Sequence, residues 1–221
     1  MLAEGQHAAT NCLEVRRLGI RPYREVWEFQ KAYQKDLISG RGGPILVTCQ
    51  HPEVITLGTS ASAKNVLVDQ LSLASQGIEV ISVERGGDVT WHGPGQLVAY
   101  PLLDLHTKKK DVGWYMRSLE EVVLETMAHF GVSGTRIQGR AGVWMSERRK
   151  ICSMGVRLSR WCSMHGLALN VSPCHEAFSR INPCGYQDIE MTSLEEEAGR
   201  AISVSEVEEV LIEKFCKTFE Y

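Results

Sequence analysis

Apolar residues recur three and four positions apart in three stretches of the chain, which is the spacing of an amphipathic helix. Pro22 precedes the first stretch and Gly40 follows it, and proline is common at the beginning of helices and glycine just after their end. We therefore predict helices over residues 22–38, 67–76 and 114–130. Short apolar runs between turn-forming residues predict strands instead. In the first half of the chain these runs cover residues 13–18, 45–48, 54–57, 78–83 and 97–103.

The second half of the chain shows three further strand patterns, over residues 142–145, 151–158 and 162–171. Short polar turns join them, so we expect an antiparallel meander. Two capping boxes, at residues 192–195 and 203–206, predict that the chain ends in helices, the last one reaching about Phe219. The pattern predicts the α+β class, with a mixed, largely antiparallel sheet flanked by helices.

Composition places the chain among ordinary globular proteins. It has 221 residues, 43% of them hydrophobic and 23% charged. We expect a disordered N-terminus over residues 1–12 and a single catalytic domain over residues 13–221. The formal charge of −3 provides no general basic field for nucleic acid, and no run approaches the roughly 18 apolar residues of a membrane span. Seven cysteines without a secretory signal indicate reduced thiols and a cytoplasmic protein.

A glycine-rich stretch over residues 85–101 lies between two apolar runs. Its glycines allow a ligand to approach the backbone closely, while Arg85, Thr90, His92 and Gln96 provide polar groups. We read residues 85–96 as a ligand-binding loop between two strands. An ordinary connection rich in turn formers remains the alternative.

Two residues elsewhere in the chain could form a reactive pair. Pro183 and Gly185 flank Cys184, an arrangement that can present a thiol on a turn. A cysteine attacks as the thiolate, so it needs a base or cation nearby. Lys150 begins an apolar strand, where burial would favour its uncharged amine and allow proton exchange with a thiol. A buried structural cysteine and an ordinary turn lysine remain the alternatives.

Other site types have weaker support. Six cysteines and histidines fall between residues 152 and 184, but none forms a Cys-x-x-Cys pair, so we expect no metal. The chain has no Gly-x-Ser-x-Gly motif for a hydrolase and no Gly-x-x-x-x-Gly-Lys phosphate loop.

Four segments together resemble the signatures of the bacterial octanoyltransferases, or lipoyl(octanoyl) transferases. The first is Arg-Gly-Gly-x-x-Thr-x-His-x-Pro-Gly-Gln, at residues 85–96, followed by Tyr-Pro. The others are Lys-Ile-x-Ser-x-Gly at 150–155, His-Gly-x-Ala-Leu-Asn-Val at 165–171 and Phe-x-x-Ile-x-Pro-Cys-Gly at 178–185. Each motif alone is weak evidence, but four motifs in a fixed order make a chance similarity very improbable.

The resemblance implies a fold similar to the catalytic domains of biotin and lipoate protein ligases. It also implies transfer of an octanoyl group from octanoyl-acyl carrier protein, through an acyl-cysteine thioester, to a lysine of a lipoyl domain. The acceptors implied are the E2 subunits of 2-oxoacid dehydrogenases and the glycine cleavage H protein. No cofactor is implied, and we expect a monomer.

By the same resemblance, Cys184 is the nucleophile and Lys150 its partner. The segments that bind the acyl group correspond to Arg85, Gly86, Gly87, Asp88, Val89, Thr90, Trp91, His92, Ser153, Met154, Gly155, Gly166, Leu167 and Ala168. One departure is visible, because Cys174-His175 stands where many members have Asp-Leu. It adds a thiol that could be mistaken for the nucleophile.

An octanoyl chain offers about seven carbons to bury, worth on the order of 5 kcal/mol, so we expect a bounded apolar slot. Three other activities stay open: an ATP-dependent lipoate protein ligase, an amidotransferase between lipoyl-bearing proteins, and a non-catalytic module that binds lipoyl domains. An acidic carrier protein would need a basic landing patch. The candidates are Arg140, Arg148, Arg149 and Arg157.

Overall fold

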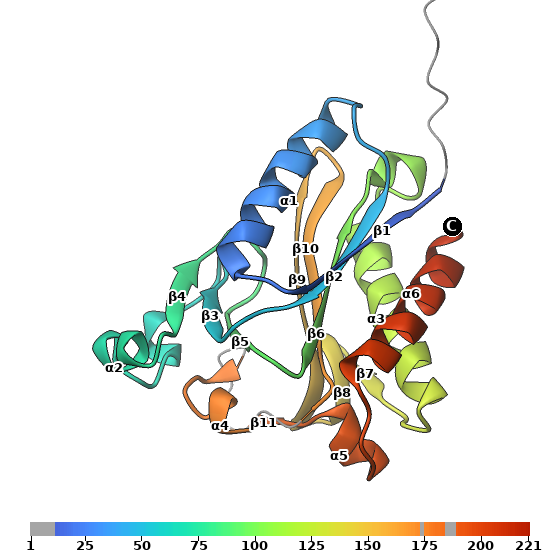
Figure 1. The fold of residues 1–221 in the computed structure, drawn as a ribbon. Coiled ribbons are helices and arrows are strands. Elements are labelled where there is room, and N and C mark those ends of the chain that lie inside the picture. Colours follow the sequence, from blue (N-terminus) through green and yellow to red (C-terminus); the bar gives the residue numbers. More distant parts are fainter. Residues whose placement is uncertain (1–11, 173–174, 184–188) are drawn as a thin grey trace, which may run out of the picture.

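The computed structural model describes residues 12–172, 175–183 and 189–221 (Figure 1). Among them, eight strands form a large mixed sheet. In spatial order its main path runs β1 (Glu14–Ile20), β2 (Ile45–Gln50), β6 (Gln96–Leu102), β10 (Cys162–Asn170), β9 (Arg149–Ser159), β8 (Arg140–Ser146) and β7 (Thr135–Ile137). The eighth strand, β11 (Glu190–Met191), pairs with the beginning of β9.

The pairing in this sheet is mostly antiparallel. Strands β8, β9 and β10 form consecutive antiparallel pairs, which confirms the predicted meander. Two pairs are parallel, β1 with β2 and β11 with β9. Strand β6 pairs with both β2 and β10, so the run after the glycine-rich stretch lies inside the sheet, and all of its residues are buried.

A second sheet of three strands lies beside the first, in the order β4 (Glu79–Ser82), β3 (Val54–Leu57) and β5 (Val89–His92). The short helix α2 (Gln70–Ser75) lies on the side of this small sheet that is away from the large sheet in Figure 1. Strand β5 corrects the prediction of one continuous loop over residues 85–96. Its four residues are all buried and pair with β3, and only the Gly93-Pro94-Gly95 segment separates β5 from β6.

Helices cover both faces of the large sheet (Figure 1). Helix α1 (Tyr23–Ile38) packs its apolar stripe on one face, together with side chains of β2, β6 and β10. Helices α3 (Val112–His129) and α6 (Val204–Phe219) pack on the opposite face and form the largest apolar core. No helix in the described part of the chain is long and apolar enough to cross a bilayer.

The remaining elements refine the prediction in three places. The box expected at residues 192–195 is one residue off, because Ser193 and Glu196 form the capping box of α5 (Leu194–Ala198). Thr192 lies one residue before this cap, and its hydroxyl donates to Glu197 Oε1 at 2.6 Å. The box at 203–206 caps α6 as predicted. The short elements β7, β11 and α4 (His175–Phe178) were not predicted.

The α+β class is confirmed, since the large sheet is mixed and mostly antiparallel with helices on both faces. Residues 1–11, which carry most of the predicted disordered terminus, lie outside the described residues. The division into that terminus and a single domain stays a prediction.

Candidate functional site

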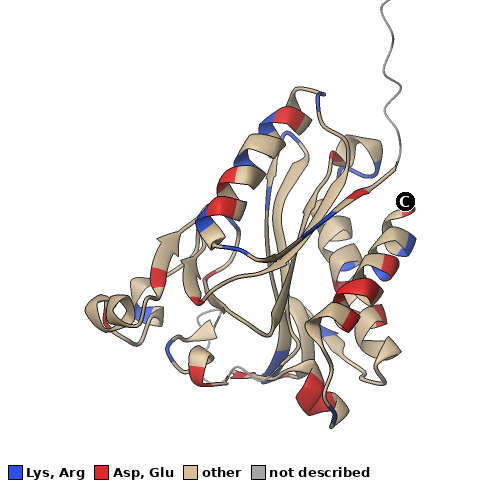
Figure 2. Cartoon of the chain, in the orientation of Figure 1, with Lys and Arg blue, Asp and Glu red and all other residues tan. Residues whose placement is uncertain are grey.

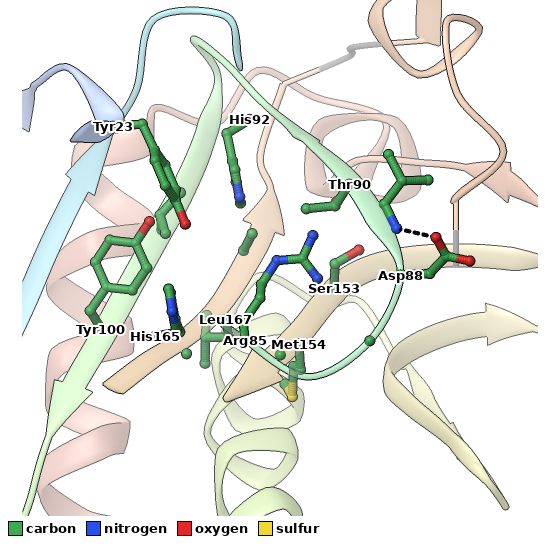
Figure 3. Close-up of a pocket in the computed structure, with 16 residues that line it drawn as sticks. Tyr23, Arg85, Asp88, Thr90, His92, Tyr100, Ser153, Met154, His165 and Leu167 are labelled. Atoms are coloured by element: carbon green, nitrogen blue, oxygen red, sulfur yellow. Dashed lines mark hydrogen bonds between the residues drawn. The ribbon is translucent and has the colours of Figure 1, made fainter. Parts of the chain in front are cut away.

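A pocket opens between the two sheets (Figure 3). The segment from Arg85 to His92 forms one wall, and strands β6, β9 and β10 form the other. The hollow, counted out to open solvent at its mouth, has a volume of about 490 Å³. Its lining consists of Tyr23, Arg85, Gly87, Asp88, Val89, Thr90, His92, Val98, Tyr100, Ser153, Met154, Gly155, His165, Gly166, Leu167 and Ala168.

The three segments predicted to bind substrate meet at this pocket. All of their residues line it except Gly86 and Trp91. The Gly86 main-chain N–H donates to the carbonyl oxygen of Val156 at 3.0 Å and ties the wall segment to β9. The Trp91 ring points away, because alternate residues of a strand face opposite sides, and it packs edge-on against Phe178. These two residues support the wall from outside.

Two glycines allow the strands to approach the wall segment closely. A Cβ atom on Gly155 would lie 2.6 Å from the carbonyl oxygen of Gly86. A Cβ atom on Gly166 would collide with the carbonyl oxygen of Ala99 on β6. Both obstacles are main-chain atoms, which cannot rotate away. Only glycine therefore fits at these positions without moving a strand or the wall.

Arg85 holds the wall segment against the small sheet. Its side chain is 8% exposed, and its Nη2 donates to the carbonyl oxygen of Thr56 at 2.7 Å and to the hydroxyl oxygen at 2.9 Å. Nη1 donates to the carbonyl oxygen of Gly86 at 3.1 Å. The fork geometry of guanidinium suits several acceptors at once, so one side chain fixes the position of the segment.

Four lining residues were not predicted as site residues: Tyr23, Val98, Tyr100 and His165. Tyr23 begins α1, and its position in a helical apolar stripe indicated only core packing. Val98 and Tyr100 lie on β6 and follow the alternation of an inward-facing strand. Two of the four carried a usable signal, because His165 begins one of the four motifs and Tyr100 belongs to the Tyr-Pro pair that follows the first.

His165 has an unusual backbone and an unusual side chain. Its φ of 61° is in the left-handed region, which non-glycine residues seldom adopt and which is more common at functional sites. The Oε1 atom of Gln30 accepts its main-chain N–H at 2.9 Å. The side chain is 1% exposed, yet neither ring nitrogen has a hydrogen-bond partner among the described residues.

Other polar atoms of the lining are in the same situation. The hydroxyl oxygens of Thr90 and Ser153 are buried without a hydrogen-bond partner in the described structure. Buried polar groups are normally paired, so these atoms indicate a place where a ligand or water supplies the partner. The pocket therefore combines apolar contacts, from residues such as Val98 and Leu167, with polar groups on both of its walls.

Three buried histidines lie in or beside the pocket: His51, His92 and His165. Burial lowers the pKa of His51 to about 4. Burial, with a smaller contribution from His51, lowers the pKa of His92 to about 3. Burial and the nearby Arg85 lower the pKa of His165 to about 3. All three rings are therefore neutral at pH 7 and can accept a hydrogen bond at one nitrogen.

Lys150, the predicted catalytic lysine, is 2% exposed near the beginning of β9, the strand that also carries Ser153 and Gly155. Its Nζ atom lies 4.7 Å from the centre of the Trp144 ring on β8. Its main chain is held by β11, because the N–H of Thr192 donates to the Lys150 carbonyl oxygen at 2.9 Å. Lys150 is thus a core lysine, not a solvated turn residue.

Cys184, the predicted nucleophile, and Gly185 beside it lie outside the described residues. The described chain ends at Pro183 and resumes at Ile189, immediately before β11. Cys174, the second thiol of that region, also lies outside. The predicted pairing of Cys184 with Lys150 stays a prediction.

Four of the five described cysteines are held as thiols by burial. Burial raises the pKa of Cys152 to about 12, although Lys150 acts in the opposite direction. Burial also raises the pKa of Cys162 to about 11 and raises the pKa of Cys49 and of Cys216. Within the described residues, no group of three or more histidine, cysteine, aspartate or glutamate side chains could hold a metal ion.

Sequence comparison matches residues 22–216 to the lipoyl protein ligase A/B catalytic domain family. The chain is 50% identical to the octanoyltransferase of Gloeobacter violaceus over 168 residues, which is 76% of this chain and 73% of that protein. It is 40% identical to the octanoyltransferase of Christiangramia forsetii over 224 residues, covering 94% of this chain and 96% of that protein.

Structural comparison gives the same fold. The bipartite lipoate protein ligase of Thermoplasma acidophilum superposes with a TM-score of 0.74 at 17% identity, over 95% of this chain and 85% of that one. The biotin protein ligase of Aquifex aeolicus superposes with a TM-score of 0.52 at 14% identity, over 95% and 70%. These matches confirm the fold expected from the four motifs, and at such identities they concern the fold alone.

Proposed function

Because this chain belongs to the octanoyltransferase family, we propose that it is an acyltransferase that moves an octanoyl group from an acyl carrier protein to a lysine of a lipoyl domain. The observation that carries the proposal is the pocket, where the three segments expected to bind the acyl group meet. The E2 subunits of 2-oxoacid dehydrogenases and the glycine cleavage H protein are the proposed acceptors.

Cys184 is the proposed nucleophile. Four of the other cysteines are held as thiols by burial, whereas the Pro-Cys-Gly motif is where the family resemblance expects the reactive one. In the first step the Cys184 thiol gives its proton to the Lys150 amine, and the sulfur attacks the thioester carbonyl of the carrier. The carrier thiolate leaves and takes a proton back from Lys150.

In the second step the uncharged amine of the acceptor lysine attacks the octanoyl thioester of Cys184. An amide bond forms, the carbon–sulfur bond breaks, and Lys150 moves the amine proton to the leaving sulfur. A thioester releases free energy when it becomes an amide, so the transfer needs no nucleotide. Main-chain N–H groups at the Pro-Cys-Gly turn are the proposed donors to the oxyanion.

The acyl chain would occupy the pocket between the sheets. Val98 and Leu167 offer apolar contact, and Gly155 and Gly166 let main-chain atoms line a narrow slot. Burial of about seven carbons at roughly 0.8 kcal/mol for each CH₂ group would supply most of the binding free energy. Thr90 and Ser153 would direct their free hydroxyl groups to polar parts of the substrate or to bound water.

The basic patch proposed for the carrier protein is weaker than the sequence implies. Figure 2 shows both acidic and basic positions along α1 and α6, so neither helix presents a purely basic surface. Arg149 contacts two carboxylates, Glu197 at 3.0 Å and Glu190 at 3.6 Å, so little of its charge is left for a partner. Arg140, Arg148 and Arg157 remain the proposed contacts for an acidic carrier.

Intact-protein mass spectrometry tests the mechanism directly. The protein is mixed with octanoyl-acyl carrier protein and no nucleotide, and we expect a mass gain of one octanoyl group that is lost when a lipoyl domain is added. Cys184→Ser should abolish the hydroxylamine-sensitive adduct, and Cys174→Ser, the matched control, should keep it. Lys150→Arg should slow adduct formation by about 10²-fold or more.

The result also separates the alternatives. A lipoate protein ligase would require ATP and form no adduct on cysteine. A non-catalytic module would keep its function after replacement of both Cys184 and Lys150. Formation of the same adduct on Cys184→Ser at neutral pH would remove Cys184 from its proposed role.

A further inference from the structure

A chain of buried hydrogen bonds leads from the pocket toward Lys150. His92 Nδ1 lies 2.7 Å from Gln96 Oε1, and Gln96 Nε2 lies 2.9 Å from Asn170 Oδ1. Asn170 Nδ2 lies 3.0 Å from the carbonyl oxygen of Thr192, whose own N–H donates to the carbonyl oxygen of Lys150. Gln96 and Asn170 are each 1% exposed, so water does not compete for these contacts.

The direction of every bond in this chain is fixed by two main-chain carbonyl groups, which can only accept. Because the Thr192 carbonyl accepts, the nitrogen of the Asn170 amide must face it, and the Asn170 oxygen therefore faces Gln96. Gln96 must then present its nitrogen, which also lies 3.3 Å from the carbonyl oxygen of Trp91. Its oxygen is left to face His92.

This order decides where the His92 ring carries its proton. An amide oxygen can only accept, so His92 Nδ1 must be the donor. Burial lowers the pKa of His92 to about 3, so at pH 7 the ring carries one proton and Nε2 is a bare acceptor. The plane of the ring is fixed as well, since Tyr23 stacks on it at 5.6 Å with 17° between the planes.

This series of hydrogen bonds also connects separate parts of the fold. Gln96 begins β6, Asn170 ends β10, and Thr192 follows β11. The turn before Gln96 is itself held, because the N–H of Gly95 donates to Gln50 Oε1 at 2.8 Å and its carbonyl accepts from Val171. A displacement of the Gln96 or Asn170 amide would therefore move both the His92 ring in the pocket and the segment that holds the Lys150 main chain.

We propose that Gln96 and Asn170 are positioning residues, which hold His92 as the Nδ1–H tautomer with Nε2 as a hydrogen-bond acceptor toward the pocket and connect that ring to the main chain of Lys150. Neither amide lines the pocket, so each acts through another residue. Nε2 is placed to accept a hydrogen bond from an N–H, S–H or water donor in the pocket, and it does not act as an acid. The kinetic part of this inference rests on the proposed transfer reaction.

Nitrogen-15 NMR of the histidine rings tests the tautomer in the whole protein at pH 7, without substrate, with His92→Asn used for assignment. We expect the protonated type of shift at Nδ1 and the unprotonated type at Nε2 of His92. Gln96→Met keeps the side-chain volume similar and removes all three side-chain hydrogen bonds of Gln96, so it should release the His92 ring to a mixture of tautomers. A proton on Nε2 in the wild-type protein would overturn the inference.

Kinetics provide the second readout. Gln96→Met should lower kcat/KM for octanoyl transfer about tenfold or more, because displacement of catalytic groups by a fraction of an ångström has effects of this size. Gln34→Met is the matched control. Gln34 is a buried glutamine whose amide donates to the Cys162 carbonyl, and it takes no part in the hydrogen-bond series from His92 to Lys150. Equal kcat/KM in the two variants would contradict the inference.

The two measurements separate this inference from the proposed function. If the wild-type protein transferred no octanoyl group, the proposed function would fail, and the NMR result would still decide the tautomer. If transfer occurs and both readouts change in Gln96→Met but not in Gln34→Met, a purely structural role of the amide is excluded, because both variants lose one buried glutamine.

Discussion

Alanine at position 155 would place a methyl group between β9 and the wall segment of the pocket. Its Cβ atom would lie 2.6 Å from the Gly86 carbonyl oxygen, about 0.4 Å inside the 3.0 Å that real Cβ contacts essentially never cross. The next obstacle is Cδ of Arg85, at 3.2 Å. Because the first contact is with main-chain atoms, the wall segment must move outward, and the bond from the Gly86 N–H to Val156 must lengthen.

The size of the effect follows from two contributions. Overpacking of this kind usually lowers the free energy of unfolding by about 1–3 kcal/mol. Displacement of the wall also removes contact with the acyl chain, and each CH₂ group that loses its contact contributes about 0.8 kcal/mol less, close to a fourfold change. With two such groups affected, we expect Gly155→Ala to lower kcat/KM about fifteenfold.

Urea denaturation and transfer kinetics measure the two contributions separately. The matched control is Gly43→Ala, because a Cβ atom on Gly43 meets no atom within 4 Å and the residue is exposed. We expect the control to keep both stability and kcat/KM. If Gly155→Ala matched Gly43→Ala within 0.5 kcal/mol and within twofold in kcat/KM, the packing argument for a narrow slot between the wall and β9 would be refuted.

Three further predictions concern stability. The three buried histidines have folded-state pKa values below the 6.5 of an unfolded chain, so the unfolded state binds protons first as the pH falls. Stability should be full above pH 6.5 and fall toward pH 4 by up to about 1.4 kcal/mol per pH unit for each ring; a flat urea-denaturation profile from pH 7 to 5 would contradict this. Arg85→Lys removes the fork that holds Thr56 and should lower both the free energy of unfolding, by about 1–3 kcal/mol, and kcat/KM; an unchanged melting temperature would count against it. Asp111→Ala removes the N-cap of α3, where the Asp111 carboxylate accepts from the Trp114 N–H. Calorimetry should show a free energy of unfolding lower by about 1 kcal/mol, and transfer kinetics should stay unchanged. A loss of transfer activity would disprove the second expectation.

Local pattern was enough to predict most elements of this fold, because helices and strands bury one face at a fixed period. The helix expected over 22–38 is α1 (Tyr23–Ile38), and the strand over 54–57 has the observed limits of β3. Pairing could not be predicted in the same way. The parallel pairing of β1 with β2 and the position of β6 between β2 and β10 depend on contacts between segments far apart in the chain.

The missed strand β5 shows how local signals mislead. Four glycines and a proline within eleven residues favour a loop, yet Val89, Thr90 and Trp91 are good strand formers and pair with β3. The strand is short and begins just after two glycines, so the flanking turn residues dominated the prediction. Its alternation has a functional consequence, because it directs Thr90 and His92 into the pocket while Trp91 packs on the other side.

The site followed from motif order better than from residue type. Motifs located nearly all of the wall and strand residues, because the motifs contain the segments where one strand must approach another part of the main chain closely. Tyr23 could not be found this way, since a tyrosine at the start of an amphipathic helix has an ordinary packing role, and only the fold brings it onto His92. Gln96 and Asn170 lie within motifs, but their direction of hydrogen bonding appears only when Thr192 is placed.

The two-sheet architecture explains why distant segments must cooperate. The large sheet supplies a floor from β9 and β10, and its strands are fixed by pairing on both sides. The small sheet supplies the wall, and the bond from the Gly86 N–H to the Val156 carbonyl ties this wall to the floor. The width of the slot is therefore set by how closely main chain meets main chain, and substitutions that add a single carbon there should alter substrate selection more than substitutions of the side chains that line it.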